Sequence, residues 1–140
     1  MTWTIATTDD LLAVHDLRHA VFVIEQGFSE EDEWDGQDDH AIQTLAKVDG
    51  EPVGTARILI SDGVGKIGRL CVLKPHRGRG LGVALVQFSI AHLRQTSGVG
   101  RIVLGAQQYA IGFYEKLGFQ LCGPVYDDGG VPHRAMEIVL

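Results

Sequence analysis

The segment KPHRGRGLG at residues 74–82 constrains the fold of this chain more than any other feature. Three glycines alternate there with larger residues, directly after an apolar run and directly before an apolar helical pattern. Glycines at this spacing let successive backbone N–H groups point into one concavity, with the positive end of a helix dipole behind them. Arg77 and Arg79 can add charge-assisted hydrogen bonds. The segment therefore predicts a strand–turn–helix unit that binds a diphosphate.

Two better-known phosphate motifs do not fit this segment. The dinucleotide pattern GxGxxG would begin at Gly78 but meets Val83 where its third glycine belongs, and no GxxxxGK[ST] occurs in the chain. The alternative is a glycine-rich turn without a ligand. A turn needs one glycine, however, and this one holds three beside two arginines.

The hydrophobic period changes along the chain in a way that predicts one α/β domain, of the α+β type, over residues 1–140. A short strand at residues 3–6 precedes a helix that opens with a Thr7 and Asp10 capping pair and ends at Gly27. An acidic loop follows at residues 28–39, with one helical turn at 31–34. The remaining expected elements are a meander of strands at 41–48, 52–60 and 66–73, a helix at 83–94, a strand at 101–105, a helix at 107–117, and strands at 119–122 and 134–140.

Composition and charge exclude several classes of protein. Apolar residues make up 45% of the chain, no apolar stretch exceeds five residues, and the first thirty residues lack the pattern of a signal peptide. We therefore expect a cytoplasmic protein with no membrane span. Cys71 and Cys122 lie in apolar stretches without metal-ligand spacing, so we expect inert thiols and no metal. The net charge of -6 argues against nucleic-acid binding.

Two motifs resemble those of the GCN5-related N-acetyltransferase (GNAT) family. The family's acyl-CoA motif [Q/R]xxGx[G/A] is matched by Arg77, Gly80 and Gly82. Its second motif, N-x-x-A-x-x-x-Y, is matched by Gln107, Ala110 and Tyr114, with Gln in place of Asn. The segment LRHAVFVIEQGF, the acidic stretch after it and the late PHRAM are similar to the ElaA-like branch of this family.

This resemblance implies a mixed, mostly antiparallel sheet that is splayed in the middle and has helices on both faces. The strand at 66–73 would diverge from the strand at 101–105, and the pantetheine arm of acetyl-CoA would fill the gap. The implied cofactor-binding residues are Leu70, Cys71, Val72, Arg77, Gly78, Arg79, Gly80, Leu81, Gly82, Val83, Gln107, Ala110 and Tyr114. The N–H of Val72 would polarise the thioester carbonyl, and Tyr114 would protonate the departing thiolate.

The reaction implied is direct transfer of an acetyl group to a primary amine of a small molecule or peptide, with CoA as product. Residues 64–73 contain no carboxylate that could serve as the general base. A water chain, Glu25, Glu33, Asp35, His40 and His133 remain open as sources of the base. The acceptor-side candidates are Arg18, Phe22, Glu25, Glu33, Asp35, Arg69 and His133.

The acidic segment at 30–39 holds seven of the eighteen acidic residues and no Lys or Arg. We expect it either to line the acceptor mouth and attract a cationic amine, or to be a solvated loop. Arg18 can pair with this segment instead of contacting the acceptor. Cys71 is interpreted as a core residue rather than a nucleophile.

Two other functions stay open at this point. One is a CoA-binding sensor or interaction module that has lost transfer activity, and the other is a nucleotide-binding regulator. The acceptor amine, the acyl-chain preference and a possible homodimer do not follow from the sequence.

Overall fold

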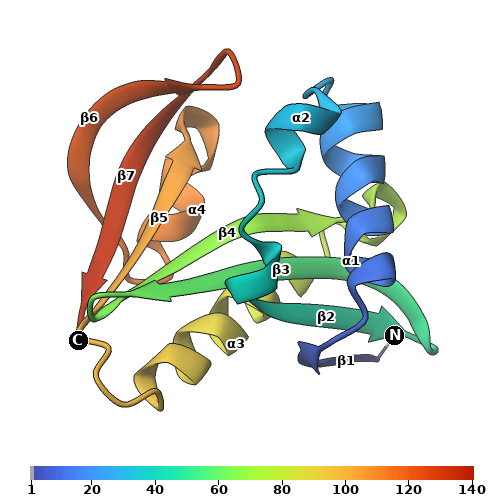
Figure 1. Ribbon diagram of the computed structural model, residues 1–140, viewed down its shortest axis with the longest axis horizontal. Coiled ribbons are helices and arrows are strands. Elements are labelled where there is room, and N and C mark those ends of the chain that lie inside the picture. The colour runs from blue at the N-terminus through green and yellow to red at the C-terminus, as the bar shows by residue number, and fades with distance from the viewer. Residues whose placement is uncertain (1) are drawn as a thin grey trace.

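The computed structural model describes residues 2–140, and all of its strands lie in one seven-stranded sheet of order β1-β2-β3-β4-β5-β7-β6 (Figure 1). Every strand pair is antiparallel except β4 with β5. The strands are β1 (Trp3–Thr8), β2 (Ile42–Val48), β3 (Glu51–Ser61), β4 (Val64–Val72), β5 (Arg101–Gln107), β6 (Gln120–Asp128) and β7 (Val131–Val139). The helical segments are α1 (Leu11–Arg18), η1 (His19–Glu25), α2 (Glu30–Glu33), η2 (Asp38–His40), η3 (Lys74–His76), α3 (Leu81–Arg94), η4 (Gln108–Ala110) and α4 (Ile111–Glu115).

Helices cover both faces of the sheet, as expected from the resemblance. On one face α1 buries Val14 and Leu17 against Leu45 of β2. On the other face Leu85 of α3 packs with Ala46, the next residue of β2. Successive side chains of a strand point to opposite faces. Leu45 therefore faces α1, and its neighbour Ala46 faces α3 on the other side of the sheet. No helix within residues 2–140 is long and apolar enough to cross a membrane.

The two predicted hairpins between β2, β3 and β4 are confirmed. Asp49 and Asp62 have φ angles of 51°, and each is followed by a glycine with positive φ. Two consecutive residues of positive φ match the twist of the strands that they join.

The first helix differs from its predicted start and form. Its N-cap is Asp10, whose side chain accepts a hydrogen bond from the N–H of Ala13 at 3.1 Å, so the predicted Thr7 and Asp10 capping pair is wrong. After Arg18 the chain continues as the π-helix η1, which the apolar spacing did not reveal. Gly27, with φ of 79°, follows its end.

The last two strands are longer than predicted. Most side chains of the edge strand β6 are exposed, so the strand lacks the alternation of apolar and polar residues from which its length could be read. The predicted helix at 107–117 divides into η4 and the short α4 because β5 extends to Gln107.

The sheet opens between β4 and β5, as the resemblance predicts. These strands pair only at Val64 with Arg101, Gly65 with Ile102, and Lys66 with Val103. Beyond these pairs they diverge into a wedge, with β4 on one side and β5 on the other (Figure 1). Residues 67–72 of β4 therefore present backbone groups that no strand partner satisfies on that edge.

Candidate active site

A cleft of about 1240 Å³ occupies the wedge and continues onto the face that carries α1. Residues of β4, β5, η1, the start of α3 and the β6–β7 hairpin line it. A typical small-ligand site has a volume of about 300 to 1,000 Å³. The larger volume here can hold a cofactor arm and an acceptor together.

The glycine-rich turn forms one end of the cleft. Gly78 and Gly80 have φ angles of 77° and 86°, a region that side chains disfavour, and Gly80 is the N-cap of α3. The first N–H groups of a helix have no partner within it, so those of Leu81, Gly82 and Val83 are available to an anion. A Cβ atom built on Gly82 would lie 3.8 Å from Phe113, which leaves the turn uncrowded. These features fit the diphosphate of CoA.

Arg77 joins this turn to the opposite wall of the cleft. Its Nη1 and Nη2 each donate to a carboxylate oxygen of Glu25 at 2.6 Å, and its Nε donates to the carbonyl of Val72 at 2.8 Å. The hydrogen bonds from Arg77 lower the pKa of Glu25. Arg79 does not line the cleft, whereas the other residues predicted for the cofactor do.

The edge of β4 presents a hydrogen-bond donor to the wedge. The N–H of Leu73 donates to the carbonyl of Val53 on β3 at 2.9 Å. Because consecutive N–H groups of a strand point to opposite edges, the N–H of Val72 points away from β3 and toward β5. The carbonyl of Val72, on that same edge, is the one that accepts from Arg77.

Tyr114 lies on α4 and contacts the cleft from the side of β5. Its ring is held edge-on by Phe113 at 5.0 Å and by Phe119 at 5.9 Å between ring centroids. Burial raises the pKa of Tyr114 to about 12, so its hydroxyl keeps its proton at neutral pH. Gln107 and Ala110 line the cleft beside it.

The two cysteines lie in different surroundings. Cys71 is buried in the core beneath α1, and burial raises the pKa of its thiol to about 12. The interpretation of Cys71 as a core residue is confirmed. Cys122 lies on the strand β6, as predicted, and is exposed there.

The acidic segment is bound to three arginines. The fully buried Arg18 pairs with Glu33 and, through Nη1 at 2.7 Å, with Asp38. Arg57 holds both carboxylate oxygens of Asp35, at 2.8 and 2.6 Å, and Nη2 of Arg69 reaches the same carboxylate at 3.2 Å. The prediction that Arg18 pairs with this segment is confirmed.

These pairs correct part of each interpretation of the acidic segment. Asp32, Glu33 and Asp35 do line the cleft. Glu33 and Asp38 are buried, so the segment is not simply a solvated loop. Burial alone would raise the pKa of Asp38, but the hydrogen bond and charge of Arg18 outweigh it and hold the pKa well below its usual range. Since arginines neutralise Glu33, Asp35 and Asp38, these carboxylates are not available to attract a cation.

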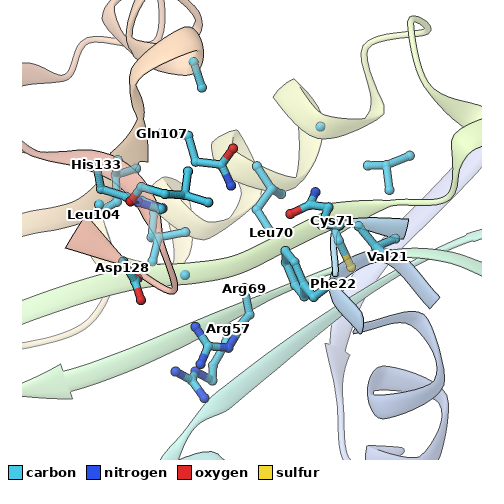
Figure 2. A pocket seen from close by; sticks show the side chains of 18 of the residues that line it. Val21, Phe22, Arg57, Arg69, Leu70, Cys71, Leu104, Gln107, Asp128 and His133 are labelled. Atoms are coloured by element: carbon cyan, nitrogen blue, oxygen red, sulfur yellow. Dashed lines mark hydrogen bonds between the residues drawn. The ribbon is translucent and has the colours of Figure 1, made fainter. Parts of the chain in front are cut away.

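The side of the cleft that is predicted to bind the acceptor contains six of the seven predicted residues. Arg18 lies outside it, because its guanidinium is enclosed by the acidic segment, and a direct contact of Arg18 with an acceptor is therefore excluded. Figure 2 shows Arg57 and Arg69 side by side below β4, and Gln107, His133 and Asp128 on the other side of the wedge from Phe22. The residues that line this side are Phe22, Glu25, Glu33, Asp35, Arg69 and His133.

Sequence reasoning missed the contribution of the β6–β7 hairpin. Tyr126, Asp128 and Val131 also line the cleft, and Phe28 lies so close to Gly129 that a Cβ atom there would clash with the Phe28 ring. The sequence DDGG at residues 127–130 is typical of a turn, but the position of this turn over the cleft depends on contacts between distant parts of the chain. Among residues 2–140, no group of three or more His, Cys, Asp or Glu side chains is placed to hold a metal ion.

Comparisons with known proteins agree with this geometry. The model of the acetyltransferase (GNAT) family matches residues 11–119. Protein ElaA of Escherichia coli (strain K12) is 34% identical over 136 residues, which cover 93% of this chain and 88% of ElaA. The N-acetyltransferase YjcF of Bacillus subtilis (strain 168), itself uncharacterised, is 36% identical over 122 residues, 86% of each chain.

Two solved structures are similar over nearly the whole chain. The crystal structure of Escherichia coli ElaA superposes with a TM-score of 0.83 at 32% identity, and covers 97% of both chains. That of an acyl-CoA N-acyltransferase from Pseudomonas aeruginosa superposes with a TM-score of 0.84 at 28% identity, again over 97% of both chains.

Proposed function

Because this chain belongs to the GNAT family of acetyltransferases and is an ElaA-like member of it, we propose that it moves an acetyl group from acetyl-CoA directly to a primary amine. An acyl-CoA-dependent acyltransferase activity follows from the family itself. The acetyl group, the amine acceptor and the roles of individual residues are our proposal.

The wedge with the glycine-rich turn at its end is the observation that carries this proposal. We propose that the turn binds the diphosphate through the N–H groups of residues 81–83, and that the unpaired edge of β4 hydrogen-bonds the pantetheine arm. The N–H of Val72 donates to the thioester oxygen and stabilises the oxyanion that forms on attack. The similar Pseudomonas aeruginosa protein is an acyl-CoA N-acyltransferase, which supports a thioester in this place.

Direct transfer fits the chemistry of the cleft better than an acyl-enzyme. Cys71 is the cysteine of the cleft wall, but it is buried and its thiol has a pKa of about 12, so little thiolate exists at neutral pH. The acceptor amine therefore attacks the thioester carbon itself. The carbon–sulfur bond then breaks, and the Tyr114 hydroxyl gives its proton to the CoA thiolate.

Release of the CoA thiol from acetyl-CoA tests the proposal, measured with a panel of polyamines, amino sugars, lysine peptides and arylamines. We expect thiol release and a matching amount of acetylated amine with at least one class. Tight binding of CoA with no turnover on any amine would support the sensor function instead. Competition of ATP or NAD with CoA for the turn would support a nucleotide-binding regulator.

A further inference from the structure

His133 lines the cleft on the side of β5 and β7. It is on β7, directly opposite Gln107 at the end of β5, and it lines the cleft (Figure 2). The residue is only 7% exposed, and its ring stacks on Tyr126 with ring centroids 5.8 Å apart. The imidazole is therefore fixed in position against the wedge.

One hydrogen bond determines which ring nitrogen of His133 can accept a proton. Nδ1 lies 2.8 Å from the carbonyl oxygen of Val131. A carbonyl oxygen only accepts hydrogen bonds, so Nδ1 must carry the proton in this contact. In the neutral ring Nε2 is then the nitrogen with a free lone pair.

The other candidates for the general base are occupied or distant. Glu25 and Asp35 each accept two hydrogen bonds from a guanidinium group, which lowers the pKa of both. Glu33 is buried against Arg18. His40 lies outside the cleft. Of the five side chains that the sequence offered, His133 is the one in the cleft without a cationic partner among the described residues.

We propose, on the basis of the function proposed above, that Nε2 of His133 is the general base that takes a proton from the acceptor ammonium. The freed amine nitrogen forms the bond to the thioester carbon, and the carbon–sulfur bond breaks. Tyr114 gives its proton to the departing sulfur and regains one from the acylated nitrogen, while His133 releases its proton to solvent. An alkylamine with a pKa of about 10.4 is unprotonated in only about one molecule in 2,500 at pH 7, so this step is needed.

Other titratable groups line the same cleft as His133. Tyr126 stacks on it from β6, Asp128 lies at the end of the same strand, and Tyr109 lies on η4. Arg134, the next residue of β7, instead donates to the carbonyl of Gly123. Asp128 is the competing base. Its side chain is exposed at the end of β6, and a carboxylate is in general a weaker base than an imidazole.

The variant His133→Asn tests the proposal, because its amide can still donate toward Val131 but has no basic nitrogen. With an alkylamine at pH 7 we expect kcat/KM to fall by about 100- to 10,000-fold. With a hydrazide or an arylamine, whose nitrogen is already unprotonated, we expect a fall of less than about tenfold, because no proton has to be removed before attack. The loss with the alkylamine should shrink as the pH rises toward 10. His92→Gln, on α3 outside the cleft, is the matched control.

Equal losses with both kinds of amine at every pH would overturn the proposal in favour of a structural role, as would full activity with the alkylamine. A selective loss in Asp128→Asn instead would assign the base to Asp128. If His133→Asn does not fold, His133→Gln is measured in the same two assays. The wild-type protein separates the two proposals, since failure to acetylate any amine would refute the proposed function and not only the base.

Discussion

We propose the Tyr114 hydroxyl as the general acid of the reaction. Its pKa of about 12 keeps it protonated throughout the physiological range. Tyr114→Phe removes the proton and leaves the ring contacts with Phe113 and Phe119. We expect kcat to fall by about 100- to 10,000-fold while the affinity for CoA changes little. Steady-state kinetics together with calorimetric titration of CoA measure both quantities, and unchanged turnover would remove the acid role.

The two cysteines should differ in reactivity as they differ in surroundings. The thiol of Cys71 is buried with a pKa of about 12, whereas Cys122 is exposed. Because the thiolate is the reactive form, iodoacetamide at pH 8 should label Cys122 and leave Cys71 unmodified in the folded protein. Mass spectrometry of tryptic peptides measures the labelling, and the unfolded protein, in which both should react, is the control. Rapid labelling of folded Cys71 would contradict its burial.

At the scale of elements, the arginine pairs hold the acidic segment, including α2 and η2, against α1 and β3. Removing one partner of a buried ion pair leaves the other charge uncompensated, at a cost of about 3 to 5 kcal/mol. We therefore expect Arg18→Met to lower the free energy of unfolding by about that amount in urea titration. Arg101→Met removes the exposed pair with Glu137 and should have a much smaller effect. A similar effect of both variants would mean that burial of Arg18 does not matter.

The ion pairs of the acidic segment should also make the free energy of unfolding fall at acidic pH. The pKa of Asp38 is lowered in the folded protein from an ordinary value of 3.8, so its contribution is complete above that value and is lost as the pH falls below it. Asp38→Asn removes this contribution. We expect the free energy of unfolding of the wild type to fall more steeply below about pH 4 than that of the variant. Parallel pH curves would show that Asp38 is not the linked group.

Elements with a strong local signal could be predicted from the sequence, and those without one could not. The Asp-Gly dipeptides fix both hairpins, and the alternating glycines fix the turn before α3, because positive φ leaves few other residues possible. The length of β6 has no such local signal, since pairing with β7 rather than its own pattern extends it. The π-helix η1 could not be predicted either, because the spacing of its apolar residues also fits an α-helix.

At the scale of the whole molecule, the turn proposed to bind the cofactor follows from short motifs, whereas the side of the cleft proposed for the acceptor depends on contacts between distant segments. The turn at residues 77–82 is contiguous in sequence, so its chemistry could be read directly. The arginine partners of Glu33 and Asp35 lie on α1, β3 and β4. No local sequence pattern predicts these pairs. His133 could be named as one of five bases, but only the fold shows that the other four are occupied or outside the cleft.

Binding of the cofactor in the wedge should also raise the melting temperature of the whole molecule. A ligand that binds only the folded state at 100 times its Kd stabilises it by about 2.7 kcal/mol. For a chain of 140 residues this raises Tm on the order of 5 to 10 °C. We expect acetyl-CoA to produce such a shift in a thermal melt. S-acetylpantetheine carries the same thioester arm without the diphosphate, and at equal concentration it should produce a smaller shift.

The variant Arg77→Ala tests whether Arg77 accounts for the difference between the Tm shifts with acetyl-CoA and with S-acetylpantetheine. Without its guanidinium, the turn keeps its N–H groups but loses the positive charge that we propose turns from Glu25 to the phosphate when CoA binds. The variant should therefore reduce the shift with acetyl-CoA, raise the KM for acetyl-CoA and leave the shift with S-acetylpantetheine unchanged. Arg101→Ala, at the end of β5 where it still pairs with β4, should change neither shift. Equal shifts of the wild type with both ligands would contradict diphosphate binding at the turn, because the thioester arm alone would then account for the binding energy.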